Sequence, residues 1–285
     1  MKAPRRRPDG KPTYAEVLAA AVNDIAEHGY DSEERLARWQ KLLAEAAESA
    51  AGSEEFLDDL LRRSLLREYE RLVGGDALLK LHPGVSRFTI EHIRPQLRAQ
   101  LDRSIAASAD LIRLNKAEAV RKTLQRFSGW ATSVPPGGAI EESRRKTKVE
   151  IKKSLSSLPF TERRVLIDQG HKLSASINRI VAVEGGAIGC IWHSHYRQAG
   201  YDYRVDHKER DGHFYLMKNS WAKAAGLVKP GPSGYYEDIT AAAQEPFCRC
   251  FVTWVYSIGR IPVECLTKKG EASLAEVRAK MMGAA

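Results

Sequence analysis

The feature that most constrains this chain is the spacing of its apolar residues, which differs between its two halves. From Thr13 to about residue 130 apolar residues recur every three or four positions, as the first of them do: Val17, Leu18, Ala21 and Ile25. This spacing is typical of amphipathic helices, and Ser, Thr or Asp at the starts and glycines at the ends mark their limits. Pro95 marks either a first-turn start or a kink. We expect helices over about 13–30, 31–52, 53–75 and 86–130.

The second half changes from helical spacing to alternation. The motif SVPPGG at 133–138 ends the first pattern, and a basic connecting helix follows it. One more helix, capped at Thr161, is expected to run to residue 183. Apolar and polar residues then alternate, which predicts short strands. These strands are expected within 187–196, 202–205, 213–216 and 248–258. A tail helix closes the chain.

These patterns predict an α+β protein, in which a helical N-terminal region precedes a small α+β domain with a short antiparallel sheet. The expected organisation is a disordered basic arm (1–12), an α-helical interaction region (13–158), the α+β domain (159–266) and a tail helix (267–285). No apolar run reaches the roughly 18 residues of a transmembrane helix, and the basic start lacks the apolar segment of a secretory signal. Synthesis in the cytosol, with no membrane partner, is therefore expected.

The chain is basic, with a formal net charge of +9. A positive balance favours acidic partners, of which nucleic acid is the commonest. One short segment is especially rich in cations that would contact phosphates without sequence preference. These candidates are Arg144, Arg145, Lys146, Lys148, Lys152 and Lys153. A solvated helix face would have the same composition.

Polar residues also recur at intervals of seven on the helix after residue 160. Arg164, His171 and Asn178 therefore share one face. This stripe is either solvated or turned toward the sheet, where it would hydrogen-bond the neighbouring loops.

Histidines and cysteines supply the candidate metal ligands. The acids Asp206, Glu209 and Asp211 lie beside or between His207 and His213, where Asp211-Gly212 is a turn signal. The motif Cys248-Arg249-Cys250 precedes the clearest strand. Imidazole, carboxylate and thiolate are ligands that a soft divalent metal selects. Cys190 and Cys265 are interpreted as ordinary buried thiols.

Several of these features, taken in order, resemble the phage Mu F-like head morphogenesis family. They are Trp192 on a strand, Arg204-Val205, a histidine four residues before Asp-Gly, a Pro-Gly loop and the terminal Cys-Arg-Cys. The similarity covers roughly residues 160–257. Many relatives carry an additional cysteine pair where this chain reads VDHKE. The resemblance implies a minor capsid protein that is incorporated into the prohead near the portal and supports assembly and DNA packaging or delivery.

From the ligand types and the long loop, and not from this resemblance, we expect the DHKERDGH turn to fold over the start of the last strand. His207 and Asp211 would then approach Cys248 and Cys250 and form a structural zinc site, with His213 as the reserve ligand. Four protein ligands would leave zinc no open position. Such a clip would close the long 216–246 loop and limit the entropy of the unfolded chain.

The function expected from the sequence is that of a minor head morphogenesis protein of a tailed bacteriophage. Its partners would be the portal or major capsid protein and possibly packaged double-stranded DNA, first in the host cytoplasm and then in the virion head. The alternatives are a metal-dependent enzyme, such as a nuclease or an ADP-ribosyltransferase-like toxin, and a non-specific DNA-binding protein. Enzymatic activity is disfavoured because the acids at 206–211 lack a second carboxylate cluster and no activated nucleophile is evident.

Overall fold

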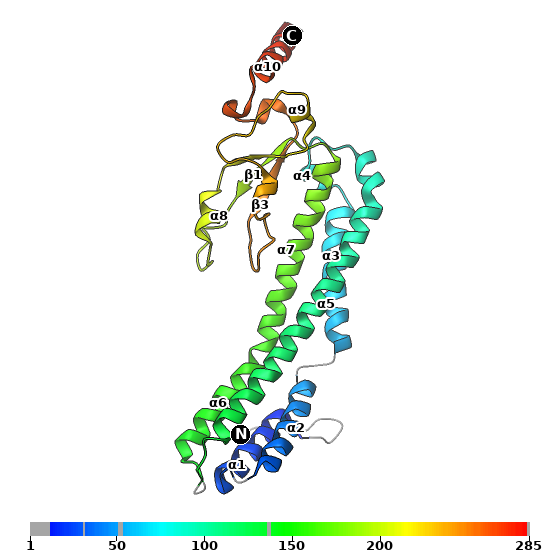
Figure 1. Cartoon of the computed structure of the whole chain (residues 1–285). Coiled ribbons are helices and arrows are strands. Elements are labelled where there is room, and N and C mark those ends of the chain that lie inside the picture. Colours follow the sequence, from blue (N-terminus) through cyan, green and yellow to red (C-terminus); the bar gives the residue numbers. More distant parts are fainter. Residues whose placement is uncertain (1–11, 31, 51–53, 136–137, 284–285) are drawn as a thin grey trace. The chain divides into compact units, whose positions relative to one another are not determined.

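The computed structural model describes residues 12–30, 32–50, 54–135 and 138–283. Figure 1 shows a mainly helical chain with one small sheet, and this confirms the predicted fold class. Most of the predicted basic arm, residues 1–11, lies outside the described residues. No helix in the described ranges is long and apolar enough to cross a membrane.

The elements follow one another in chain order. The longer helices are α1 (Tyr14–His28), α2 (Glu33–Ala50), α3 (Glu54–Val73), α5 (Arg87–Ala131), α6 (Glu141–Ser156), α7 (Leu158–Glu184) and α10 (Lys268–Gly283). The short helices are α4 (Ala77–Leu81), α8 (Val205–Glu209), α9 (Trp221–Ala224), η1 (Tyr236–Asp238), η2 (Ile258–Arg260) and η3 (Val263–Cys265). The strands are β1 (Gly189–His193), β2 (Phe214–Leu216) and β3 (Phe251–Val255).

The chain forms two compact units, and each unit draws on two stretches of sequence. The first comprises Met1–Arg62 and Ala106–Val165, and the second comprises Arg63–Ile105 and Leu166–Ala285. The sequence analysis assumed that each domain is one continuous stretch of the chain. The grouping of residues 63–105 with the sheet was therefore not expected.

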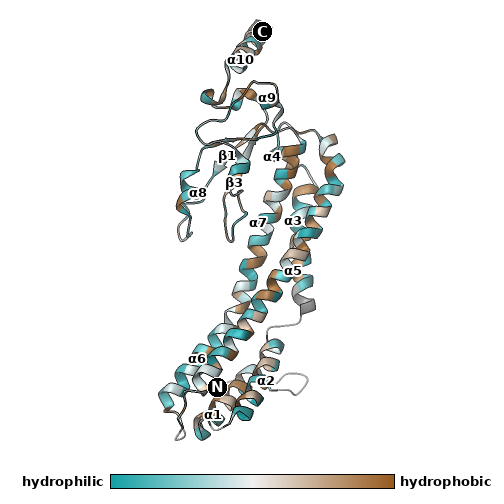
Figure 2. Ribbon diagram, viewed as in Figure 1, coloured by the Kyte–Doolittle hydropathy of each residue, from teal (hydrophilic) through white to brown (hydrophobic). Residues whose placement is uncertain are grey.

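The first unit is a helical assembly whose core is built from α1, α2, α5 and α6. Helix α1 starts as predicted, because Thr13 and Glu16 form a reciprocal capping box. Its apolar face buries Ala21, Val22 and Ile25 against residues of the other helices, including Leu43 and Phe127. Figure 2 shows the mixture of hydrophobic and hydrophilic residues along these helices that such one-sided burial requires.

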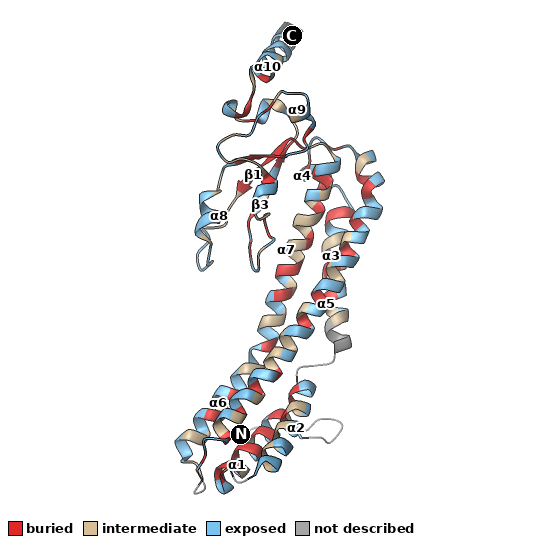
Figure 3. Ribbon diagram, in the orientation of Figure 1, coloured by how far each residue is buried: buried red, intermediate tan, exposed pale blue. Residues whose placement is uncertain are grey.

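The second unit contains the sheet, whose strand order is β2-β1-β3 with both pairings antiparallel. Cys190 of β1 pairs with Tyr215 of β2 and Trp254 of β3, so these three side chains share one face. That face packs on a buried cluster that also contains Trp192. The burial of β1 is visible in Figure 3. The predicted alternation of Cys190 and Trp192 is therefore confirmed.

Buried polar side chains join further elements of the second unit. His82, which is fully buried, lies with Nδ1 2.5 Å from the Tyr256 hydroxyl and Nε2 2.8 Å from Asn178 Oδ1. The Nδ2 group of Asn178 donates to the Ser174 carbonyl, and the Ser174 hydroxyl donates to Glu68. This chain of hydrogen bonds connects α3, the turn before α5, α7 and the end of β3.

Some local predictions were wrong. Thr161 does not cap a helix, because α7 already begins at Leu158 and the Thr161 hydroxyl donates to Ser157 within it. Of the two readings of Pro95, the first-turn start is wrong, because Pro95 lies inside α5. Residues 202–205 form no strand, and the helical turn α8 begins at Val205. An ion pair between Asp206 and Arg210, four residues apart at 2.8 Å, supports that turn.

Candidate metal centre

The helical turn α8 places His207 under the surface of the second unit. In the turn Asp206, Lys208 and Glu209 are exposed, whereas His207 is only 1% exposed. Its ring packs edge-on against Trp192 of β1, with ring centroids 5.3 Å apart. The buried face of the sheet therefore forms the floor of the site.

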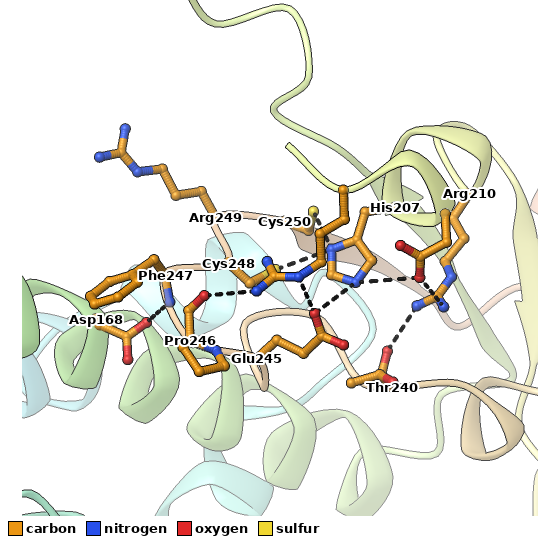
Figure 4. Close-up of polar contacts among 12 residues, drawn as sticks. Asp168, His207, Arg210, Thr240, Glu245, Pro246, Phe247, Cys248, Arg249 and Cys250 are labelled. Atoms are coloured by element: carbon orange, nitrogen blue, oxygen red, sulfur yellow. Dashed lines mark hydrogen bonds and ion pairs between the residues drawn. The ribbon is translucent and has the colours of Figure 1, made fainter. Parts of the chain in front are cut away.

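Cys248 and Cys250 reach the same place from the segment that leads into β3. The Nδ1 atom of His207 lies 3.5 Å from Cys248 Sγ and 3.6 Å from Cys250 Sγ (Figure 4). For zinc bonds of about 2.3 Å to sulfur and 2.0–2.1 Å to nitrogen, tetrahedral geometry separates the two ligand atoms by about 3.6 Å. The three ligand atoms all lie within 4.8 Å of one another, and all three residues are buried. This group can hold a metal ion.

The opposite side of the His207 ring faces acidic residues. Its Nε2 atom is buried and has no hydrogen-bond partner among the described residues, but it lies 3.7 Å from a Glu245 oxygen and 3.8 Å from an Asp206 oxygen. Glu245 is in turn ion-paired with Arg204. A metal-binding histidine commonly directs its second N–H to a carboxylate. This arrangement therefore fits a ring that binds through Nδ1 and carries its proton on Nε2.

The two thiols interact with each other as a pair. The Cys250 thiol hydrogen-bonds Cys248 and lowers the pKa of Cys248, and this outweighs the opposing effect of burial. The backbone amides of Cys250 and Ala243 lower that pKa further. The pKa of Cys250 is raised because it holds the shared proton and is itself buried. Cys248 is thus favoured as a thiolate, the form that binds metal.

The segment before the cysteines is held in an unusual backbone conformation. Ala243 and Phe247 have positive φ angles of 63° and 59°, which are uncommon for residues other than glycine. Asp168 of α7, itself buried, accepts a hydrogen bond from the Phe247 amide at 2.6 Å and pairs with Lys172 at 2.8 Å. Asp168 therefore fixes the backbone one residue before Cys248.

The structure brings together three of the four predicted ligands, and Asp211 is not among them. Its Oδ1 atom accepts a hydrogen bond from the Ser194 amide at 2.7 Å, so the carboxylate caps the end of β1. The reserve ligand His213 is exposed and lies outside the group, with its backbone carbonyl accepting from Trp192. Cys190 and Cys265 are buried free thiols, as interpreted from the sequence.

The three residues of the predicted polar stripe on α7, Arg164, His171 and Asn178, have different surroundings. Asn178 lies in the His82 hydrogen-bond network, which agrees with the reading that the stripe bonds its neighbours. His171 is exposed, and so is Arg164, whose guanidinium lies 5.6 Å from the centre of the Phe160 ring.

The predicted nucleic-acid contacts lie on α6 of the first unit. Three of them have acidic or polar partners: Arg144 pairs with Glu141, Lys146 with Glu142, and Lys148 bonds Asn23. The others are exposed and make no ion pair with a described residue: Arg145, Lys152 and Lys153.

Reasoning from the sequence did not assign Asp168, Asp206 or Glu245 to the centre, although Asp206 was noted as one of the acids beside His207. Glu245 opens the motif EPFCRC, and an acid close to paired cysteines was an available signal. Asp168 is 79 positions from its partner Phe247, and no short motif connects them.

Comparisons of the chain with protein-family models, curated proteins and solved structures gave no match.

Proposed function

We propose that this chain is a minor head morphogenesis protein of a tailed bacteriophage. It acts in prohead assembly and in DNA packaging or delivery near the portal, in contact with the portal or major capsid protein. The proposal starts from the resemblance of residues 160–257 to the Mu F-like family. One observation supports it most: His207, Cys248 and Cys250, which belong to that resemblance, meet in one buried group although 41 positions separate His207 from Cys248.

The role proposed for this group is a structural zinc clip. Zinc is favoured over harder cations because two thiols and an imidazole are soft or borderline ligands. By the chain-entropy relation for a cross-link, closing a loop of this length contributes about 4 kcal/mol. The second unit has a three-stranded sheet and long irregular connections, so it would gain directly from such a closure.

Metal analysis of the purified full chain tests the clip. We expect about one zinc ion per chain, loss of the zinc in His207→Ala and full retention in His213→Ala. The second variant is a matched control, because His213 lies six residues away and is exposed. Absence of zinc from well-folded protein, or its retention by His207→Ala, would contradict the clip.

Particle analysis tests the head function separately. A tagged copy expressed from the phage genome that encodes this chain should sediment with proheads and filled heads, in few copies per particle. Deleting the gene should lower the yield of filled heads. A chain found only outside particles, with normal head filling in its absence, would refute the proposal whatever the metal content.

A second candidate role is contact with packaged duplex DNA by the first unit. It is favoured by the three exposed basic residues of α6 that have no ion pair with a described residue. Such contacts would be made to phosphates and would carry no sequence preference. The salt dependence of duplex DNA binding tests this role.

A further inference from the structure

The metal group has one ligand fewer than tetrahedral zinc requires. Asp211, which the sequence suggested as the fourth ligand, is bonded to the Ser194 amide. Glu245 and Asp206 lie at Nε2 of His207, whereas the sulfurs face Nδ1. In the parts of the chain that the structure describes, no other histidine, cysteine or acid joins the group. The fourth position is therefore left to a ligand from outside the described residues.

A hollow of about 200 Å³ borders the group on the side of α7 and β3. Cys250 is one of its lining residues, together with Trp254, His171, His195 and Arg249. The volume is enough for several water molecules, each of which takes about 30 Å³ in the liquid. No Asp or Glu is among the described residues that line the hollow. A small neutral or anionic ligand can therefore approach Cys250 without meeting a carboxylate.

A buried hydroxyl next to Cys250 also lacks a partner. Ser194 and Cys250 adjoin the paired residues His193 and Phe251 of β1 and β3, and Ser194 Oγ is shielded from solvent with no hydrogen-bond partner among the described residues. Buried polar atoms are nearly always paired in native proteins. A water molecule or anion beside the sulfur would give this hydroxyl the partner that the described part of the chain does not provide.

We propose that a metal ion held by His207, Cys248 and Cys250 keeps its fourth coordination position open to a small exogenous ligand. The ligand is water, exchangeable for a small monovalent anion that enters through the hollow beside α7. This inference rests on the proposed metal site and deepens it. Three coordination positions of the ion would be filled by protein ligands, and the fourth would be free for an exogenous ligand.

Cobalt spectroscopy of the full chain tests this inference. Co²⁺ replaces zinc in thiolate sites and gives visible bands that report its coordination, and azide is the probe anion. We expect tetrahedral bands with thiolate charge transfer, and a saturable shift of the visible bands on addition of azide while the charge transfer persists. Asp211→Asn should leave the spectrum unchanged, and His213→Ala should behave as the parent does.

The outcomes separate this inference from the zinc clip. If Co²⁺ gives no thiolate bands, the metal site itself fails and the clip fails with it. If the bands form but saturating azide does not move them, the clip stands and the open position is refuted. A changed starting spectrum in Asp211→Asn would also overturn the inference, because it would identify Asp211 as the fourth ligand.

Discussion

Replacing Asp168 by alanine is expected to weaken metal binding at the candidate centre without removing any of the three candidate ligands. Asp168 Oδ1 accepts the Phe247 amide at 2.6 Å, and Oδ2 pairs with Lys172 at 2.8 Å. Alanine removes both contacts, together with the hydrogen bond that Oδ2 accepts from Gln169 Nε2 at 3.2 Å. It also frees a backbone whose positive φ at Phe247 is held by its surroundings. Because Cys248 is the next residue, its sulfur should lose its fixed position relative to His207.

The size of the effect can be worked out from these contacts. A hydrogen bond to a charged group contributes about 1.5–3 kcal/mol. The ion pair adds at most about 1 kcal/mol, because Lys172 is partly exposed. Together they predict a loss of about 2–4 kcal/mol, less whatever strain the freed backbone relieves. For domains of 150–250 residues each kcal/mol shifts the melting temperature by about 2–4 °C. Mutations of supporting residues typically cost about 10–100-fold in metal affinity.

Thermal unfolding of the metal-free protein and competition for zinc against a chelator measure the two effects. Asp168→Asn keeps an acceptor for the Phe247 amide and loses the charge, so it should lie between alanine and the parent. Glu184→Ala, at the exposed end of the same helix, is the control for loss of an acid from α7. Parental zinc affinity and melting temperature in Asp168→Ala would refute the anchoring role.

Three further predictions concern other parts of the chain. Burial lowers the pKa of His82. The unfolded chain therefore binds more protons than the folded one, and stability should fall as pH drops below about 6.5, with a smaller fall in His82→Asn, as measured by denaturant unfolding. A Cβ at Gly84 would lie 2.6 Å from Tyr256 Cβ, so Gly84→Ala should cost about 1–3 kcal/mol, whereas Gly75→Ala, with open space around it, should show no such clash in the same unfolding assay. If α6 contacts duplex DNA, neutralising one phosphate-binding cation should reduce the slope of log K against log salt by about 0.9, and unchanged slopes would contradict the contact. The cations to replace by glutamine, one at a time, are Arg145, Lys152 and Lys153.

The helical part of the fold could be predicted from sequence because its evidence is local. The capping box of Thr13 and Glu16 lies within four residues, and the apolar stripe of α1 repeats along one helix. The division into compact units could not be predicted in the same way. It depends on which distant helices share a core, and α5 carries residues of both units. Periodicity identifies the buried face of a helix but not the helix that covers it.

The candidate site shows the same limit at the scale of single residues. The types and spacing of His207, Cys248 and Cys250 predicted that they meet, because few other roles suit an imidazole and two closely spaced thiols. Asp211 was predicted as a ligand for the same reason, because a carboxylate can bind zinc. In the structure its carboxylate instead accepts a hydrogen bond from the Ser194 amide, 17 positions earlier. Residue type determines which partners a side chain can bind, whereas the fold determines which of those partners lies close enough to bind it. Glu245 and Asp168 illustrate the converse, since each supports the centre through one contact that only the folded chain creates. The candidate metal centre, with three potential protein ligands and acids behind its histidine, is thus a property of the packing of α7, α8 and the segment before β3. Substitutions in that packing should alter it as surely as substitutions of His207, Cys248 or Cys250.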